Sequence, residues 1–120
     1  MIVHGKERNF LLTVGASAEI AEMCPGGEIS RIGEILEGPY NKVLRTTAKI
    51  IAAMSRGYEN NRKYEEPGYV PEPLTVDEIM ALPTGILHKL EEEALAKFNA
   101  DTGTSVEIEE PKKDNGAKTE

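Results

Sequence analysis

The sequence contains no tryptophan, a single cysteine and few aromatic residues, and these absences argue against several classes of protein. One cysteine cannot form an internal disulfide, so the chain suits a reducing compartment rather than a disulfide-stapled secreted domain. Aromatic residues are only 5% of the chain, which leaves no obvious platform on which bases could stack. The sequence also lacks a membrane-length apolar run and a secretory leader. We therefore expect a cytoplasmic protein that binds neither membrane nor nucleic acid.

The charge balance is acidic, with 21 aspartate and glutamate residues against 14 lysine and arginine residues and a net charge of −7. A protein that binds a phosphate backbone needs clustered basic residues, which this composition does not supply. The length of 120 residues corresponds to one domain. We expect residues 1–100 to form that domain.

Residues 101–120 differ in composition from the rest of the chain. Acidic side chains predominate there, and Val106, Ile108 and Ala117 are its apolar residues. So little apolar surface cannot offset the entropy lost on ordering, which predicts a disordered, acidic polar tail. Ser105–Glu109 nevertheless alternates polar and apolar residues, so this stretch could form a strand on a partner.

The first 14 residues predict a small β-hairpin. Ile2 and Val3 are apolar, Gly5 provides a turn, and apolar side chains then recur at every second position, at Phe10, Leu12 and Val14. Because a two-stranded hairpin is marginal by itself, we expect it to lie on an apolar surface.

Helical patterns dominate the rest of the domain. Ser17 suits the N-cap of a first helix, which Pro25 must end. A second helical stripe covers residues 29–36, and the longest helix is expected over residues 40–64. Three prolines and a glycine over residues 65–73 then predict an extended crossing.

Two further helices are predicted beyond this crossing. Thr75 and Glu78 have the spacing of a capping box, and Pro83 separates the short helix that they open from a last helix ending near residue 98. The chain is thus predicted to be mainly α, with four or five helices and an N-terminal β-hairpin. The predicted core gathers the apolar residues that recur at helix or strand spacing: Phe10, Leu12, Val14, Ile20, Ile32, Leu36, Leu44, Ile51, Ile79, Leu87, Leu90 and Leu95.

No residue pattern indicates catalysis or a metal site. His4 and His88 lie at opposite ends of the domain and do not form a zinc-binding spacing with Cys24. Cys24 has no base beside it in the sequence and is expected to be a small buried apolar residue. The carboxylates are numerous but unpatterned. We therefore expect a protein that is not an enzyme and that binds no metal and no cofactor.

A family resemblance rests on three features in order: Gly5-Lys6, the sequence FLLTVGA over residues 10–16, and a short helix ending near CPGG over residues 24–27. With these features the chain resembles the small tail assembly chaperones of long-tailed bacteriophages and prophages. A helical body, a proline-rich crossing and a polar tail are also typical of that family. The resemblance implies a role in virion morphogenesis in the cytoplasm of a bacterial host.

The resemblance also implies partners. Such a chaperone would bind the tape measure protein, keep it soluble and help to recruit tail tube protein around it; a homo-oligomer would also fit. Tyrosines suit a partner-facing surface, since each combines an apolar ring with a polar tip. The predicted partner-binding residues lie on the long helix and the crossing: Leu44, Ile51, Tyr58, Tyr64 and Tyr69. The alternative for the tyrosines is that they cap the core.

A second hypothesis belongs to a different class of protein. A small acidic regulator or inhibitor could occupy a basic, nucleic-acid-binding surface by mimicking its ligand. It would need ordered carboxylates at the spacing of phosphates, whereas the acidic residues here are spread through the chain. The two hypotheses differ in salt dependence, since charge mimicry weakens steeply as ionic strength rises.

Overall fold

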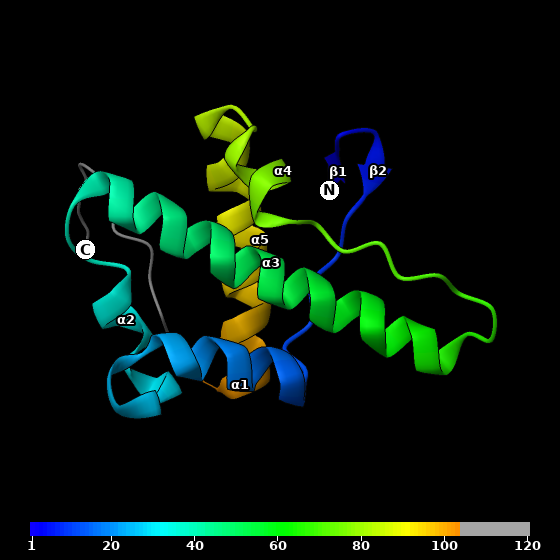
Figure 1. The fold of residues 1–120 in the computed structure, drawn as a ribbon, viewed down its shortest axis with the longest axis horizontal. Coiled ribbons are helices and arrows are strands. Elements are labelled where there is room, and N and C mark those ends of the chain that lie inside the picture. Colours follow the sequence, from blue (N-terminus) through cyan, green and yellow to red (C-terminus); the bar gives the residue numbers. More distant parts are fainter. Residues whose placement is uncertain (104–120) are drawn as a thin grey trace.

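The computed structural model describes residues 1–103, which form a mainly helical domain with a short N-terminal hairpin, as predicted (Figure 1). The elements in order are β1 (Ile2–Val3), β2 (Lys6–Glu7), α1 (Val14–Met23), the 3₁₀ turns η1 (Pro25–Gly27) and η2 (Ile29–Arg31), α2 (Ile32–Ile35), α3 (Tyr40–Glu65), α4 (Val76–Met80) and α5 (Thr84–Thr102).

Helix α3 is the central element, and the others pack around its first two thirds. Helix α5 crosses α3 steeply, and α1 lies along the lower side of α3 (Figure 1). Helix α4 contacts α3 near the N-terminal end of α5. At about 1.5 Å per residue, the 26 residues of α3 span about 39 Å. This length exceeds the width of the helices packed on it, so the C-terminal end of α3 projects from the body.

The hairpin is present, but its predicted second strand is wrong. Strand β1 pairs with β2, with Ile2 opposite Glu7 and Val3 opposite Lys6. The two residues between them, His4 and Gly5, both have positive φ, which matches the tight turn that joins twisted antiparallel strands. A turn this short fixes the partner of β1 immediately after residue 5, so the alternating run over residues 10–14 forms no strand.

The start of α1 also differs from the prediction. Thr13, not Ser17, is the N-cap, and its hydroxyl accepts a hydrogen bond from the Ala16 N–H at 3.1 Å. Val14 therefore becomes the first residue of the helix and is 90% exposed, which makes its assignment to the core wrong. The other helix boundaries follow local signals, including the predicted capping box of Thr75 and Glu78, which is confirmed.

Gly57 allows the segment before α1 to pass close to the backbone of α3. A Cβ at this position would overlap the Leu11 carbonyl oxygen and lie 3.0 Å from the Thr13 Oγ1 and 3.3 Å from the Ala16 Cβ. The Leu11 N–H also donates to the Met54 carbonyl of α3 at 3.1 Å. The segment before α1 thus lies directly on the α3 backbone, which a larger residue at position 57 would prevent.

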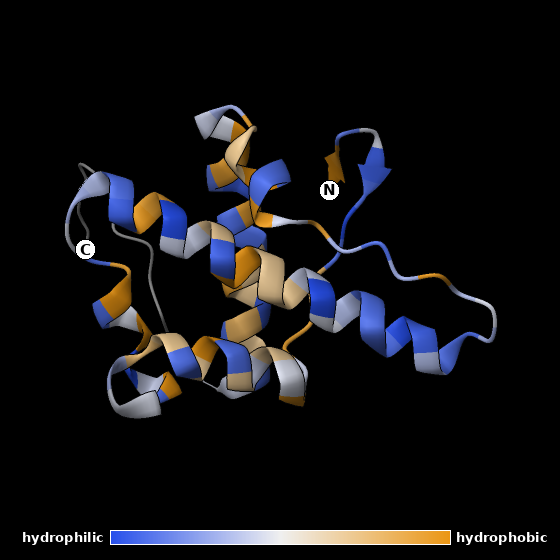
Figure 2. Cartoon of the chain, viewed as in Figure 1, coloured by the Kyte–Doolittle hydropathy of each residue, from blue (hydrophilic) through white to orange (hydrophobic). Residues whose placement is uncertain are grey.

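Most of the predicted core is confirmed, and α3 supplies its centre. Figure 2 shows the apolar character of the middle of α3 giving way to hydrophilic residues toward its C-terminal end. Leu12, Leu36 and Leu44 are partly buried at the edge of the core, and the remaining predicted core residues apart from Val14 are buried. The core also includes residues that the prediction omitted, among them Val3, Met54, Leu74 and Phe98.

The last helix continues past residue 100, where the sequence predicted that the domain ends. Helix α5 continues to Thr102 and is capped by Gly103 in the left-handed conformation, so Asp101 and Thr102 belong to the folded domain. Asp101 accepts a hydrogen bond from the Leu12 N–H at 3.2 Å, which ties the end of α5 to the segment before α1. The tail predicted beyond this point lies outside the described residues.

Candidate partner-binding surface

The C-terminal end of α3 and the loop that follows it form a projecting arm, which we define as residues 58–74. The loop turns at the tip and runs back along α3 toward the body (Figure 1). Neither α1 nor α5 covers this part of α3 in Figure 1, so the loop itself provides its packing.

Side chains of α3 satisfy the backbone of the returning loop. Proline lacks an N–H, so the donors in the PEPL stretch that ends the loop are those of Glu72 and Leu74. The Glu72 N–H donates to the Glu59 carboxylate at 2.9 Å, and the Leu74 N–H donates to the Ser55 hydroxyl at 2.8 Å. Because Ser55 and Glu59 are four residues apart, they share one face of α3 and hold two alternate residues of the extended loop. Leu74 is fully buried as a result.

Glu59 is the polar centre of the arm. The residue is 3% exposed, and its carboxylate also accepts a hydrogen bond from the Tyr69 hydroxyl at 2.6 Å. That hydrogen bond raises the pKa of Tyr69, since the neighbouring carboxylate favours the protonated phenol. A buried carboxylate needs such donors to offset its desolvation, so Tyr69 and the Glu72 N–H fix the path of the loop around it.

Arg62 joins the tyrosines of the arm. Its guanidinium lies 4.3 Å from the centre of the Tyr69 ring and 5.9 Å from that of Tyr58, both within cation–π range. The same guanidinium forms an ion pair with Glu66 at 2.6 Å. Arg62 therefore links the outer face of α3 to the start and the middle of the loop.

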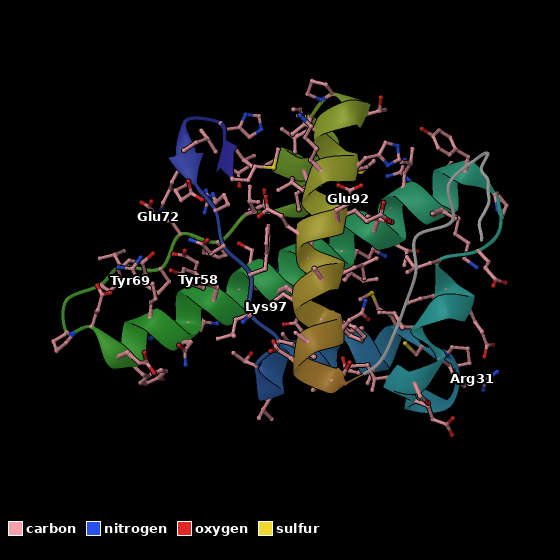
Figure 3. The ribbon with its side chains drawn as sticks, turned by 180° about the vertical axis from the view of Figure 1, so that it is seen from behind. Arg31, Tyr58, Tyr69, Glu72, Glu92 and Lys97 are labelled. Carbon is pink, nitrogen blue, oxygen red and sulfur yellow. The ribbon has the colours of Figure 1, made fainter. Side chains whose placement is uncertain are left out.

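The hairpin holds the base of the arm. Lys6 pairs with the Glu72 carboxylate at 2.5 Å, which lowers the pKa of that carboxyl group. Arg8, which is 6% exposed, donates from Nη1 to the Glu72 carbonyl oxygen. Figure 3 shows Glu72 between the hairpin and the arm that carries Tyr58 and Tyr69. Three parts of the chain, the hairpin, α3 and the loop, thus meet at one residue.

A groove lies where the base of the arm meets α5. Its volume is about 700 Å³, and its walls come from the segment after the hairpin, from α3 and from α5: Asn9, Phe10, Leu11, Tyr58, Asn61, Glu93, Ala96, Lys97 and Ala100. Apolar and small side chains form much of this lining, and charged or amide groups stand among them. This volume is enough for a short peptide segment, and Tyr58 belongs to both the groove and the arm.

The structure separates the predicted partner-binding residues into three places. Tyr58 and Tyr69 lie together on the arm, both half-buried, and Tyr64 stands on the same arm at 83% exposure. Leu44 is half-buried near the other end of α3, and Ile51 is 1% exposed in the core. Ile51 therefore cannot contact a partner in this conformation, and Leu44 lies far from the tyrosines.

Other residues of this surface were not singled out from the sequence. Val70 is 71% exposed on the part of the loop that returns along α3, although apolar residues of this size are usually buried. Glu59 and Arg62 look like ordinary solvent-facing charges in the sequence. The signal for Glu59 was its spacing from Ser55 on the buried stripe of α3, which predicts a carboxylate that faces the protein.

The residues weighed for other chemistry have ordinary surroundings. Cys24 is buried, and burial raises the pKa of its thiol, as expected for an unreactive apolar residue. The ring Nε2 of His4 lies 3.1 Å from the Glu78 carbonyl oxygen, while His88 lies beside Glu91 on α5. Within residues 1–103, no group of three or more histidine, cysteine or acidic side chains is placed to hold a metal ion. In the same part of the chain, every helix is too short or too polar to cross a bilayer.

Comparison of the chain with protein-family models, with curated proteins and with solved structures finds no significant match. The function of the chain is therefore inferred from this surface and from the resemblance carried by residues 5–27.

We expect Tyr69→Phe to destabilise the protein by about 1–3 kcal/mol, because it removes the hydroxyl donor from the buried Glu59 carboxylate. The ring that stacks on Arg62 is kept. Urea denaturation measures the change, and Tyr64→Phe is the matched control, because that tyrosine is 83% exposed. Equal midpoints for the two variants would contradict the role assigned to Tyr69.

Proposed function

We propose that this protein is a phage or prophage tail assembly chaperone that binds the tape measure protein, keeps it soluble before assembly and aids assembly of the tail tube. It acts by binding, and no turnover is involved. The observation that carries the proposal is the projecting arm, which displays exposed apolar surface at Tyr64 and Val70 next to the groove that contains Tyr58.

The arm has the properties of a protein-binding element. Its exposed apolar residues stand among polar and charged neighbours, a combination that suits a surface that must be soluble alone and bind when a partner is present. The hydrogen bonds of Glu59 and the contacts of Arg62 hold the loop against α3. Because the arm is ordered in advance, little conformational entropy is lost on binding.

A tape measure protein offers a suitable ligand, since long helical proteins expose apolar faces before they are packed inside a tail. Tyr58, Tyr64 and Val70 provide apolar anchors of the kind that dominate binding energy. The acidic surface of the domain keeps the complex in solution.

The acidic regulator receives less support. Charge mimicry requires free carboxylates in a fixed pattern, but several are already paired with basic side chains of the same chain: Glu19, Glu34, Glu66 and Glu72. We therefore retain the chaperone as the proposed function.

Co-expression with the tape measure protein of the same phage or prophage tests the proposal. We expect the tape measure protein to be soluble only with this chain, and the complex to survive gel filtration at moderate salt because apolar contacts are not screened. Equal solubility without this chain, or loss of the complex at moderate salt, would refute the chaperone function.

A pair of exposed positions on the arm locates the binding surface. Tyr64→Ser with Val70→Ser should abolish the complex without altering the fold, because both side chains are largely exposed. Tyr40→Ser is the matched control, since Tyr40 is 64% exposed at the opposite end of the same helix. If the control weakens binding as much as the arm variant, the partner does not use the arm.

A further inference from the structure

The groove beside the arm has one wall of extended backbone. Residues 9–11 run along it without belonging to a strand, and Leu11 donates its N–H to α3. Among the hydrogen bonds within residues 1–103, none uses the backbone N–H of Asn9 or of Phe10. In extended backbone the N–H groups of neighbouring residues point to opposite sides, so the Phe10 N–H points away from α3, which the Leu11 N–H faces. The unused Phe10 donor can pair with an added strand, as exposed sheet edges do.

The opposite wall is a face of α5 with small side chains. Ala96 and Ala100 are exposed, one turn apart, and both line the groove. Between them stands Lys97, which forms a long ion pair with Asp101 at 3.9 Å. Glu93 completes this wall and lies 3.8 Å from the N-terminal amino group. This wall can accept modest apolar side chains beside a single lysine at its rim.

The two walls run in the same direction. At the start of residues 9–11, the Met1 amino group donates to the Arg8 carbonyl and lies beside Glu93 of α5. At their end, the Leu12 N–H donates to Asp101, which lies about two turns farther along α5. A chain that leaves α5 and reverses would therefore run antiparallel to residues 9–11. Gly103 supplies a left-handed cap at that point, with φ 73°, which turns the chain out of the helix.

The chain beyond Gly103 has a matching segment. The groove follows α5 from Glu93 to Ala100, about 10 Å at 1.5 Å per residue, which three or four extended residues of about 3.3 Å would cover. In the segment SVEIE, Val106 and Ile108 alternate with two glutamates. In an extended conformation the apolar pair shares one face and the acidic pair the other.

We propose that Ser105–Glu109 of this chain binds in the groove as an added strand, antiparallel to residues 9–11. Val106 and Ile108 cover Ala96 and Ala100, and the glutamates stay at the rim, where Lys97 complements their charge. The linkage through Gly103 gives the segment a high effective concentration at the groove, so few contacts suffice. This proposal does not rest on the proposed function, although a segment bound in the groove would compete there with a partner that contacts Tyr58.

Amide hydrogen exchange of the full chain, followed by NMR, tests the proposal. We expect the Phe10 amide to exchange about tenfold more slowly in the native chain than in the Val106→Asp/Ile108→Asp variant. The matched control is Ala117→Asp/Thr119→Asp, which adds the same two negative charges farther along the tail and should leave the Phe10 amide protected. The amide of Leu90 reports on the core and should be unchanged in every variant.

A substitution in the groove provides the reciprocal test. Ala100→Arg fills the groove from an exposed position that tolerates arginine in a helix, so it should remove the protection of the Phe10 amide to the same extent. Equal exchange in the native chain and in the Val106→Asp/Ile108→Asp variant would overturn the proposal. Protection that rises with protein concentration would assign the groove to a second copy, and protection seen only with an added partner would assign it to that partner; either result would also overturn it.

Discussion

We expect Gly57→Ala to destabilise the protein by about 1–3 kcal/mol, although the same change inside a helix normally stabilises by nearly 1 kcal/mol. The reason is steric. The new methyl group would overlap the Leu11 carbonyl oxygen and crowd Thr13 and Ala16, so the segment before α1 would have to move away from α3. Urea denaturation followed by circular dichroism measures the change.

Gly85→Ala is the matched control for this prediction. Gly85 lies in α5, and a Cβ placed there meets no atom within 4 Å. The control should be neutral or stabilising, since alanine restricts the unfolded chain. If Gly57→Ala stabilises the protein as the control does, α1 does not pack on α3 as closely as described.

We expect Ile51→Ala to destabilise the protein by about 2–5 kcal/mol, because it leaves a cavity at the centre of the core. Ile51 is 1% exposed on the face of α3 that the other helices cover, so little relaxation can fill the space. This loss is a large part of the stability of a small domain, which is typically about 5–15 kcal/mol.

Leu44→Ala provides the contrast for Ile51→Ala. Leu44 is partly buried at the edge of the core, and we expect a clearly smaller loss of stability there. Thermal and urea unfolding of both variants measure the difference. Equal losses of stability in the two variants would mean that the start of α3 is packed as tightly as its centre. That result would contradict the difference in burial between Leu44 and Ile51.

The candidate site was only partly predictable from the sequence. The tyrosines indicated a partner-facing region on α3 and the loop, and Tyr58, Tyr64 and Tyr69 do lie on one arm. Ile51 was included because periodicity identifies the apolar face of a helix but does not say whether another helix covers it. The groove could not be anticipated, because its walls come from segments more than 30 residues apart in the sequence.

Local patterns in the chain were sufficient to predict the helical class and most helix boundaries, because those depend on signals within one or two turns. Pro25 ends the first helix, Thr75 and Glu78 cap the fourth, and the prolines over residues 65–73 exclude a helix there. The apolar stripe of α3 likewise identified the centre of the core from its spacing alone.

Features that depend on contacts between distant segments became visible only in the folded domain. Phe10 and Leu12 alternate like a strand, yet the tight turn at Gly5 paired β1 with residues 6–7 instead. Gly57 looked like a weak point of a helix and proves to be where the chain crosses it. Leu74 lies in a proline-rich loop and is still fully buried, because Ser55 and Glu59 bind the loop backbone to α3. Each of these features depends on which segments pack against one another in the fold. The spacing of residues along a single segment does not determine this.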